Sequence, residues 1–218
     1  MSALKLGGRL PTVVSATLWA AAVAAGFGVL LDFDTRPGDA GDPPATWPED
    51  TSIARPPGTF ELLMILHPHC PCSRASLTEL ERIAARGRGR LYVSVLLYAP
   101  AQAGEGWSDT DSRRRAEAIP GAEVILDATG AEQRRFGLRT SGHVLLYDAA
   151  GALRFSGGIT AARGHEGDSM GAAAILSLVS AASPAATAAF EPGARRAAFR
   201  TAPVFGCPLE GSDACPRR

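Results

Sequence analysis

Two histidines and two cysteines lie close together in the stretch HPHCPCSR, at residues 67–74. Thiols and imidazoles suit thiol–disulfide exchange, in which a thiolate attacks a disulfide sulfur, and both groups also bind zinc and copper. The two cysteines, Cys70 and Cys72, are separated by one proline. The stretch therefore predicts a redox site, a metal site or a structural disulfide.

The residues on either side predict a strand before this stretch and a helix after it. Residues 60–66, FELLMIL, form a short apolar run, which is typical of a strand covered on both faces. In residues 73–86, apolar side chains recur on one helical face, and Gly87 follows as a stop signal. Because α/β sheets bind ligands at the carboxyl ends of their strands, this turn favours function over a purely structural disulfide.

The rest of the central region alternates between strand and helix patterns. We expect strands at 91–98 and 122–127, a hairpin at 143–159 that turns at 148–151, and helices near 111–118, within 128–137 and at 167–182. Asp168 or Ser169 is the expected N-cap of the last helix. These elements predict an α/β domain at 59–182.

The order of these elements resembles that of the thioredoxin superfamily, in which a strand ends in a cysteine pair that opens a helix. The resemblance implies a thioredoxin-like fold, with a central mixed sheet flanked by helices, and exchange with protein thiols and disulfides without a cofactor. The segments HPHCPCSRASL, SGGITAARGHEGD and PVFGCPL also resemble a bacterial group of membrane-anchored thioredoxin-like proteins labelled RedB. One departure is Gly142, at the position where thioredoxins carry a cis-proline.

The C-x-C spacing suggests how the two thiols divide the work. With Pro71 in the first helical position, we expect Cys70 at an exposed N-cap and Cys72 in the first turn. A helix N-terminus favours negative charge, so we predict Cys70 as the nucleophile, Cys72 as the resolving cysteine and His69 as a proton-transfer or thiolate-stabilising group. A Cys70–Cys72 disulfide would distort the turn, which favours an oxidant or isomerase over a strong reductant.

Two loops are expected to border the cysteine pair and to contact substrate. One contains Gly142 and His143, and the other contains Arg163 and His165 within a glycine-rich segment. These four residues are the predicted substrate-binding group.

Metal binding is the alternative for the same region. His67, His69, Cys70 and Cys72 form a ligand set suited to copper or zinc, with His143 and His165 as further donors around one site. Against this, ligands that lie so close in sequence rarely close around one ion. A third interpretation, suggested by Gly142, is a non-catalytic module with a thioredoxin fold.

The C-terminal tail, residues 183–218, contains the other two cysteines. Cys207 and Cys215 are close enough in sequence for a local disulfide. The alternative is that Cys207 folds back to resolve a disulfide with Cys70 or to bind a metal, with Val204 and Phe205 packing the tail onto the domain. Four cysteines allow three full pairings, and the sequence does not select one.

The N-terminal region predicts a membrane anchor. Residues 12–31 contain no charge and are long enough to span a bilayer as a helix. Basic residues precede this span and acidic residues follow it, which places residues 1–11 in the cytoplasm and the domain in the periplasm or outside the cell. A cleaved signal peptide is the rival interpretation. Residues 32–58 are proline-rich and are expected to act as a spacer.

The overall charge argues against nucleic acid as a partner. The chain has 22 basic and 22 acidic residues, so its formal net charge is zero. Nucleic-acid binding relies on an excess of basic groups, which this composition does not supply. The expected partners are therefore protein thiols or disulfides and, through the N-terminal helix, a membrane.

Overall fold

The computed structural model describes residues 9–181 and 200–210, which fall into two units. The first unit, Met1–Arg36, holds the helix α1 (Arg9–Thr35). Its segment Pro11–Thr35 has a mean hydropathy of 1.9, and it is the one helix in the described ranges that is long and apolar enough to cross a membrane. The apolar helix expected at 12–31 is therefore present, and it fits either an anchor or a signal sequence.

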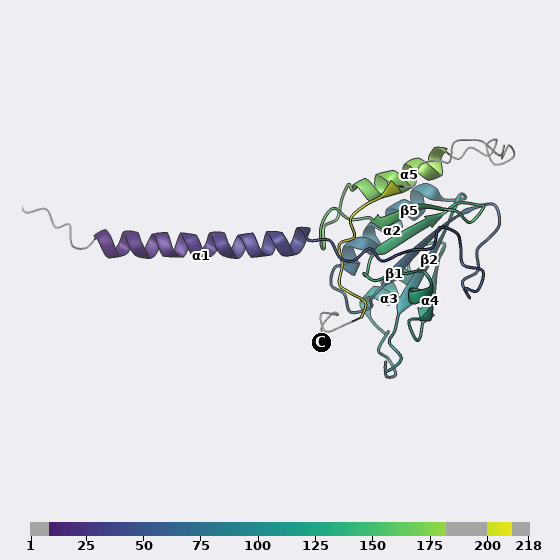
Figure 1. The fold of residues 1–218 in the computed structure, drawn as a ribbon, viewed down its shortest axis with the longest axis horizontal. Coiled ribbons are helices and arrows are strands. Elements are labelled where there is room, and N and C mark those ends of the chain that lie inside the picture. Colours follow the sequence, from purple (N-terminus) through teal and green to yellow (C-terminus); the bar gives the residue numbers. More distant parts are fainter. Residues whose placement is uncertain (1–8, 182–199, 211–218) are drawn as a thin grey trace, which may run out of the picture. The chain divides into compact units, whose positions relative to one another are not determined.

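The second unit, Pro37–Arg218, contains one mixed sheet (Figure 1). Its strand order is β3-β2-β1-β4-β5-β6. The strands β1, β2 and β3 are parallel, β4 is antiparallel to β1 and β5, and β6 is parallel to β5. The bounds are β1 Phe60–Leu66, β2 Leu91–Tyr98, β3 Ala122–Asp127, β4 His143–Tyr147, β5 Leu153–Gly158 and β6 Arg200–Thr201. The first five match the predicted strands. The strand β6 was not predicted, because it has only two residues, both exposed.

Three helices supply the core on one face of the sheet: α2 (Ser73–Gly87), α3 (Asp111–Glu117) and α5 (Met170–Ala181). Their apolar side chains pack on inward-facing residues of β1, β2 and β4, in a core that includes Leu66, Leu77, Leu80, Val95, Val144, Ile175 and Val179. The hydroxyl of Ser169 accepts a hydrogen bond from the backbone N–H of Ala172 at 3.1 Å, as expected of an N-cap. The sheet flanked by helices confirms the predicted fold class.

The proline-rich residues 37–58 contain no helix or longer strand, but they pack on the domain instead of forming an extended spacer. Residues 37–58 lie against the other face of the sheet, where the Trp47 ring packs edge-on against Phe136 at 5.0 Å and Tyr147 at 5.1 Å. Ile53 is 3% exposed. The interpretation of these residues as a spacer is therefore wrong, because apolar side chains between the prolines give the segment a surface to bury. We call residues 37–58 the N-terminal arm.

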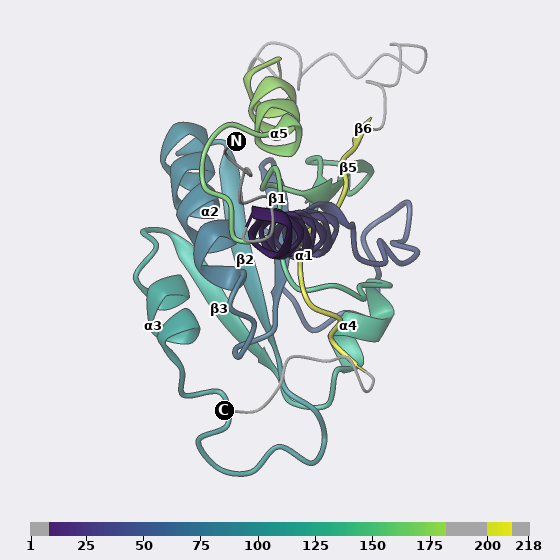
Figure 2. The ribbon, with the colours of Figure 1, turned by 90° about the vertical axis from the view of Figure 1, so that its left-hand side faces the viewer.

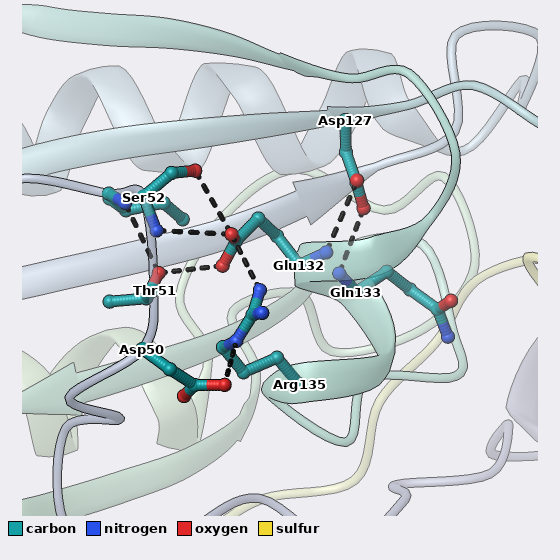
Figure 3. Close-up of polar contacts among 8 residues, drawn as sticks. Asp50, Thr51, Ser52, Asp127, Glu132, Gln133 and Arg135 are labelled. Carbon is teal, nitrogen blue, oxygen red and sulfur yellow. Dashed lines mark hydrogen bonds and ion pairs between the residues drawn. The ribbon is translucent and has the colours of Figure 1, made fainter.

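Polar contacts tie the N-terminal arm to the short helix α4 (Ala131–Arg135), as Figure 3 shows. Glu132 accepts hydrogen bonds from the Thr51 hydroxyl at 2.6 Å and from the Ser52 backbone N–H at 3.1 Å. Arg135 forms an ion pair with Asp50. The arm and α4 therefore cover the second face of the sheet together.

The C-terminal segment 200–210 also packs on the domain, beside β5 (yellow in Figure 2). The N–H of Ala202 donates to the carbonyl of Ser156, and the N–H of Gly158 donates to the carbonyl of Pro203. Val204 is 1% exposed, in line with the expectation that it holds the tail down. We call residues 200–210 the tail segment. Residues 183–199 and Cys215 of the predicted tail lie outside the described ranges.

Candidate thiol site

The turn between β1 and α2 closes before the helix starts. The N–H of Cys70 donates to the carbonyl of His67 at 3.0 Å, and the N–H of Ser73 donates to the carbonyl of Cys70 at 3.1 Å. The helix begins at Ser73, with Cys72 as its N-cap. The prediction that Cys70 is an exposed N-cap is therefore wrong: Cys70 is 2% exposed, and Cys72 is half-buried at the cap.

A third cysteine joins this pair. The Sγ atoms of Cys70 and Cys207 lie 3.1 Å apart, farther than the about 2.05 Å of a disulfide bond, so the two sulfurs are in contact without a covalent bond. Hydrogen bonds from Cys207 and from Cys72 hold the pKa of Cys70 well below its usual range, despite its burial. The site therefore favours a thiolate at Cys70, stabilised by two neighbouring thiols.

The backbone of the tail segment fixes the position of Cys207. Its carbonyl accepts a hydrogen bond from the N–H of Ser141 at 2.9 Å, and the N–H of Leu209 donates to the carbonyl of Arg139 at 2.9 Å. An antiparallel bridge between Thr140 and Pro208 lies between these two bonds. The tail segment thus pairs like a short strand with the loop that precedes β4.

Gly142 and Arg163, two of the predicted substrate-binding residues, lie next to this pairing. Gly142 has a φ of +85° and donates its N–H to the carbonyl of Ile65. A Cβ at this position would lie 2.9 Å from the Ser76 hydroxyl, so both the backbone and the available space call for glycine. The Arg163 guanidinium donates to the carbonyl of Gly206, beside Cys207. Arg163 therefore supports the tail segment, and Gly142 ties the loop before β4 to the end of β1.

The predicted histidines fall into three environments. His67 and His69 lie beside the thiol turn, with ring centroids 6.0 Å apart. His143 is fully buried and hydrogen-bonds through Nε2 to the hydroxyl of Ser156 at 2.8 Å. His165 is exposed in its loop. The expected four-histidine cluster around one site is therefore not formed.

The aromatic rings of Trp107 and Tyr98 pack against this pair of histidines. The Trp107 ring contacts both imidazoles, at 5.4 Å from His67 and 4.8 Å from His69. The Nε2 atom of His69 is hydrogen-bonded to the Trp107 carbonyl at 2.9 Å, and the backbone N–H of His69 donates to Nδ1 of His67. Burial lowers the pKa of His67 to about 4, so this imidazole is neutral at physiological pH. His67 is thus an acceptor and a packing group.

Metal ligation finds no support in this geometry. Across residues 9–181 and 200–210, no three His, Cys, Asp or Glu side chains are arranged to hold a metal ion. The proposed set of His67, His69, Cys70 and Cys72 does not converge, because His69 bonds to Trp107 and His67 packs between aromatic rings.

Two glycines at the end of β5 were expected only as part of the glycine-rich segment beside the site, but they also bring the tail segment to it. A Cβ at Gly157 would lie 2.4 Å from the carbonyl oxygen of Ala202, and one at Gly158 would lie 2.6 Å from that of Pro203. Glycine within a strand often marks the close approach of another backbone, and this was the available signal. Ser141 and Trp107 had no comparable signal.

Comparisons with known proteins support the fold. No protein-family model matches the chain, and no curated protein sequence matches it. Among solved structures, the chain is similar to a hypothetical protein from Sinorhizobium meliloti, at 18% identity and a TM-score of 0.51, over 70% of this chain and 79% of that one. An uncharacterised conserved protein from Geobacillus kaustophilus is similar at 15% identity and a TM-score of 0.53, over 83% of this chain and 94% of that one.

Taken together, the topology and the position of the cysteines define the fold. Three parallel strands with a helix after β1, followed by an antiparallel hairpin and a final helix, form a thioredoxin-like fold, and cysteines lie at the turn from the first strand to its helix. The chain therefore has a thioredoxin-like fold in its second unit and an apolar helix in its first unit.

Proposed function

We propose that the protein is a thiol–disulfide oxidoreductase, anchored to the cytoplasmic membrane by α1 with its domain in the periplasm or outside the cell. Cys70 of the C-x-C motif supplies the reactive thiolate. The observation that carries the proposal is the meeting of three thiols at the turn between β1 and α2, where Cys207 and Cys72 lower the pKa of Cys70. An exported location suits this chemistry, because disulfides persist in oxidising compartments.

The reaction transfers a disulfide between the protein and its substrate. In one direction, two protein thiols become a disulfide while a substrate disulfide becomes two thiols, and in the other direction the same bonds form and break in reverse. A thiol with a low pKa is a good leaving group, so a disulfide that includes Cys70 is readily broken. This favours an oxidant or isomerase over a strong reductant.

The loops beside the thiols are the proposed substrate-binding region. Arg163 holds the carbonyl of Gly206, and its charge also acts on Cys72, so it lies at the edge of the thiol cluster. We assign it to binding, with Gly142, His143 and His165 shaping the surrounding loops, and the substrates are protein thiols or disulfides. The membrane helix, the C-x-C turn and the tail cysteine fit the RedB-like group that the sequence resembles.

The test compares Cys70→Ser with the wild type, as the full chain in detergent. We expect wild-type protein to oxidise a dithiol peptide with turnover when oxidised glutathione is supplied as the terminal oxidant, and to reshuffle a scrambled disulfide protein. Cys70→Ser should lose both activities. Ala85→Ser, at an exposed position on the same helix, is the matched control and should behave as wild type. Full activity in Cys70→Ser would contradict the proposal.

A further inference from the structure

The thiol cluster contains two candidate partners for Cys70, and they differ in how they are placed. Cys72 is two residues away in sequence and belongs to the cap of α2. Cys207 is 137 residues away, yet its Sγ lies 3.1 Å from that of Cys70. Because the fold itself has to bring Cys207 to this position, its presence calls for an explanation beyond the C-x-C motif.

We propose that Cys207 is the redox partner of Cys70: the disulfide made and broken during exchange links these two sulfurs, and the substrate sulfur exchanges at Cys207. The proposal rests on the oxidoreductase function argued above and deepens it by naming the pair that carries the electrons.

Hydrogen bonds hold the backbone at Cys207 and at the residue before it, so its sulfur returns to the same position after each exchange. Its carbonyl is bonded to the N–H of Ser141, and the carbonyl of the preceding residue, Gly206, is bonded to Arg163. Buried side chains fix the segment farther out, with Val204 1% and Leu209 2% exposed. A pair of sulfurs held this way can form a bond after a small movement of the two side chains.

Exposure also favours Cys207 as the sulfur that meets the substrate. Cys70 is 2% exposed, so an external sulfur cannot reach it while the tail segment is in place, whereas Cys207 is only half-buried. Attack at the more accessible sulfur leaves Cys70 as the departing group. The chemistry suits this order, since thiols with a low pKa leave fastest.

Cys72 is suited to a different role. A hydrogen bond from Cys207 acts to lower the pKa of Cys72, but the neighbouring Cys70 and burial outweigh that bond and raise this pKa to about 11. Cys72 is therefore a thiol at neutral pH and donates a hydrogen bond to the Cys70 thiolate. As the helix cap, it supports Cys70 as a positioning residue.

In the oxidising direction, a substrate dithiol is oxidised in two successive attacks. A substrate thiolate attacks the Sγ of Cys207, the Cys70–Cys207 bond breaks, and its electron pair leaves with Cys70 as a thiolate. A second substrate thiolate then attacks the substrate sulfur of the mixed disulfide, which releases Cys207 as a thiolate that takes up a proton. The substrate has lost two electrons, and the Cys70–Cys207 pair has gained them.

The first experiment maps the disulfide. Full-length protein in detergent is oxidised with oxidised glutathione, blocked, digested and analysed by mass spectrometry. We expect the peptide that contains Cys70 to be linked to the peptide that contains Cys207, in wild type and also in Cys72→Ser and Cys215→Ser. The link should be lost in Cys70→Ser and Cys207→Ser. A Cys70–Cys72 or Cys207–Cys215 disulfide in the wild type would overturn the proposal.

The second experiment locates the mixed disulfide. Cys70→Ser is incubated with oxidised glutathione, and we expect glutathione on Cys207, because the thiolate that would release it is missing. Glutathione on Cys72 would overturn the assignment. Turnover distinguishes the pairing from the function. Wild-type turnover with a Cys70–Cys72 disulfide overturns only the pairing, and a wild type without turnover overturns the oxidoreductase function itself.

Discussion

A side-chain carbon at Gly206 would lie 1.8 Å from the backbone carbonyl oxygen of Ser141. At Gly206 the backbone of the tail segment therefore lies closer to the loop before β4 than a residue with a Cβ would allow. Since the next residue is Cys207, this contact helps to set the distance between the sulfurs of Cys207 and Cys70. The glycine is thus a requirement of the thiol site as well as of the backbone.

We predict that Gly206→Ala lifts the tail segment and exposes Cys70. The added methyl group would collide with backbone, which cannot move aside as a flexible side chain can, so the tail segment has to shift. Iodoacetamide should then alkylate Cys70 several-fold faster than in the wild type, as followed by mass spectrometry. Gly104→Ala is the control, because a Cβ there meets nothing within 4 Å. Equal alkylation rates in Gly206→Ala and the wild type would contradict the close packing.

A second prediction concerns the ionisation of Cys70. Because hydrogen bonds from Cys207 and Cys72 lower its pKa, the thiolate should persist as the pH falls from 9 through neutrality into the acidic range. The thiolate absorbance near 240 nm, as the difference between reduced wild type and Cys70→Ser, measures this ionisation. Cys207→Ala removes one donor and should raise the pKa of Cys70, whereas Cys207→Ser keeps a hydroxyl donor and should raise it less. A wild-type titration close to 9 would rule out this stabilisation.

The regular elements around the site were predictable because each depends on a local pattern. β1 is a continuous apolar run, and α2 has a helical apolar stripe that ends at glycine, so both matched the structure within a residue. The cysteine pair at their junction followed from the same patterns. The N-cap was placed at Cys70 instead of Cys72, and the exposure of Cys70 was misjudged because it depends on a segment far away in the sequence.

The long-range contacts were predictable only in part: the return of Cys207 to Cys70 was one of two alternatives for the tail, and the packing of the N-terminal arm was not expected. The N-terminal arm and the tail segment have few regular hydrogen bonds of their own, and their order comes from packing on a sheet that the sequence does not display. Trp47 and Cys207 each lie in segments whose composition resembles a linker. Only the glycines of β5, which admit the neighbouring backbone, gave a local sign of the tail contact.

The third prediction tests whether the N-terminal arm is part of the folded domain. Trp47→Ala removes ring contacts with Phe136 and Tyr147 and should lower the free energy of unfolding by about 3 kcal/mol, within the range for large aromatic truncations. Urea unfolding of the full chain in detergent, followed by circular dichroism, measures the change. Glu49→Ala, at an exposed position in the same arm, should leave the unfolding midpoint nearly unchanged. If Trp47→Ala has the stability of Glu49→Ala, the arm is a spacer after all.

The last prediction concerns Glu61, a carboxyl group buried in the middle of the sheet. It lies on β1 between Tyr92 and Tyr147 on the neighbouring strands and is 0% exposed. Burial raises its pKa from 4.5 to about 7. A carboxyl whose pKa is raised by folding binds its proton more tightly in the folded state, so its stabilising effect is complete below pH 4.5 and is lost as the pH rises through 7. The wild type should therefore lose stability between these two pH values. Since one pKa unit corresponds to about 1.4 kcal/mol, the full loss is about 3 kcal/mol.

Glu61→Gln keeps the shape of the side chain without the charge. Its melting temperature should therefore match that of the wild type near pH 4 and exceed it at pH 8. The control Glu105→Gln, at an exposed position, should follow the wild type at both pH values. Parallel melting curves for Glu61→Gln and the wild type at pH 8 would show that the carboxyl ionises there without cost.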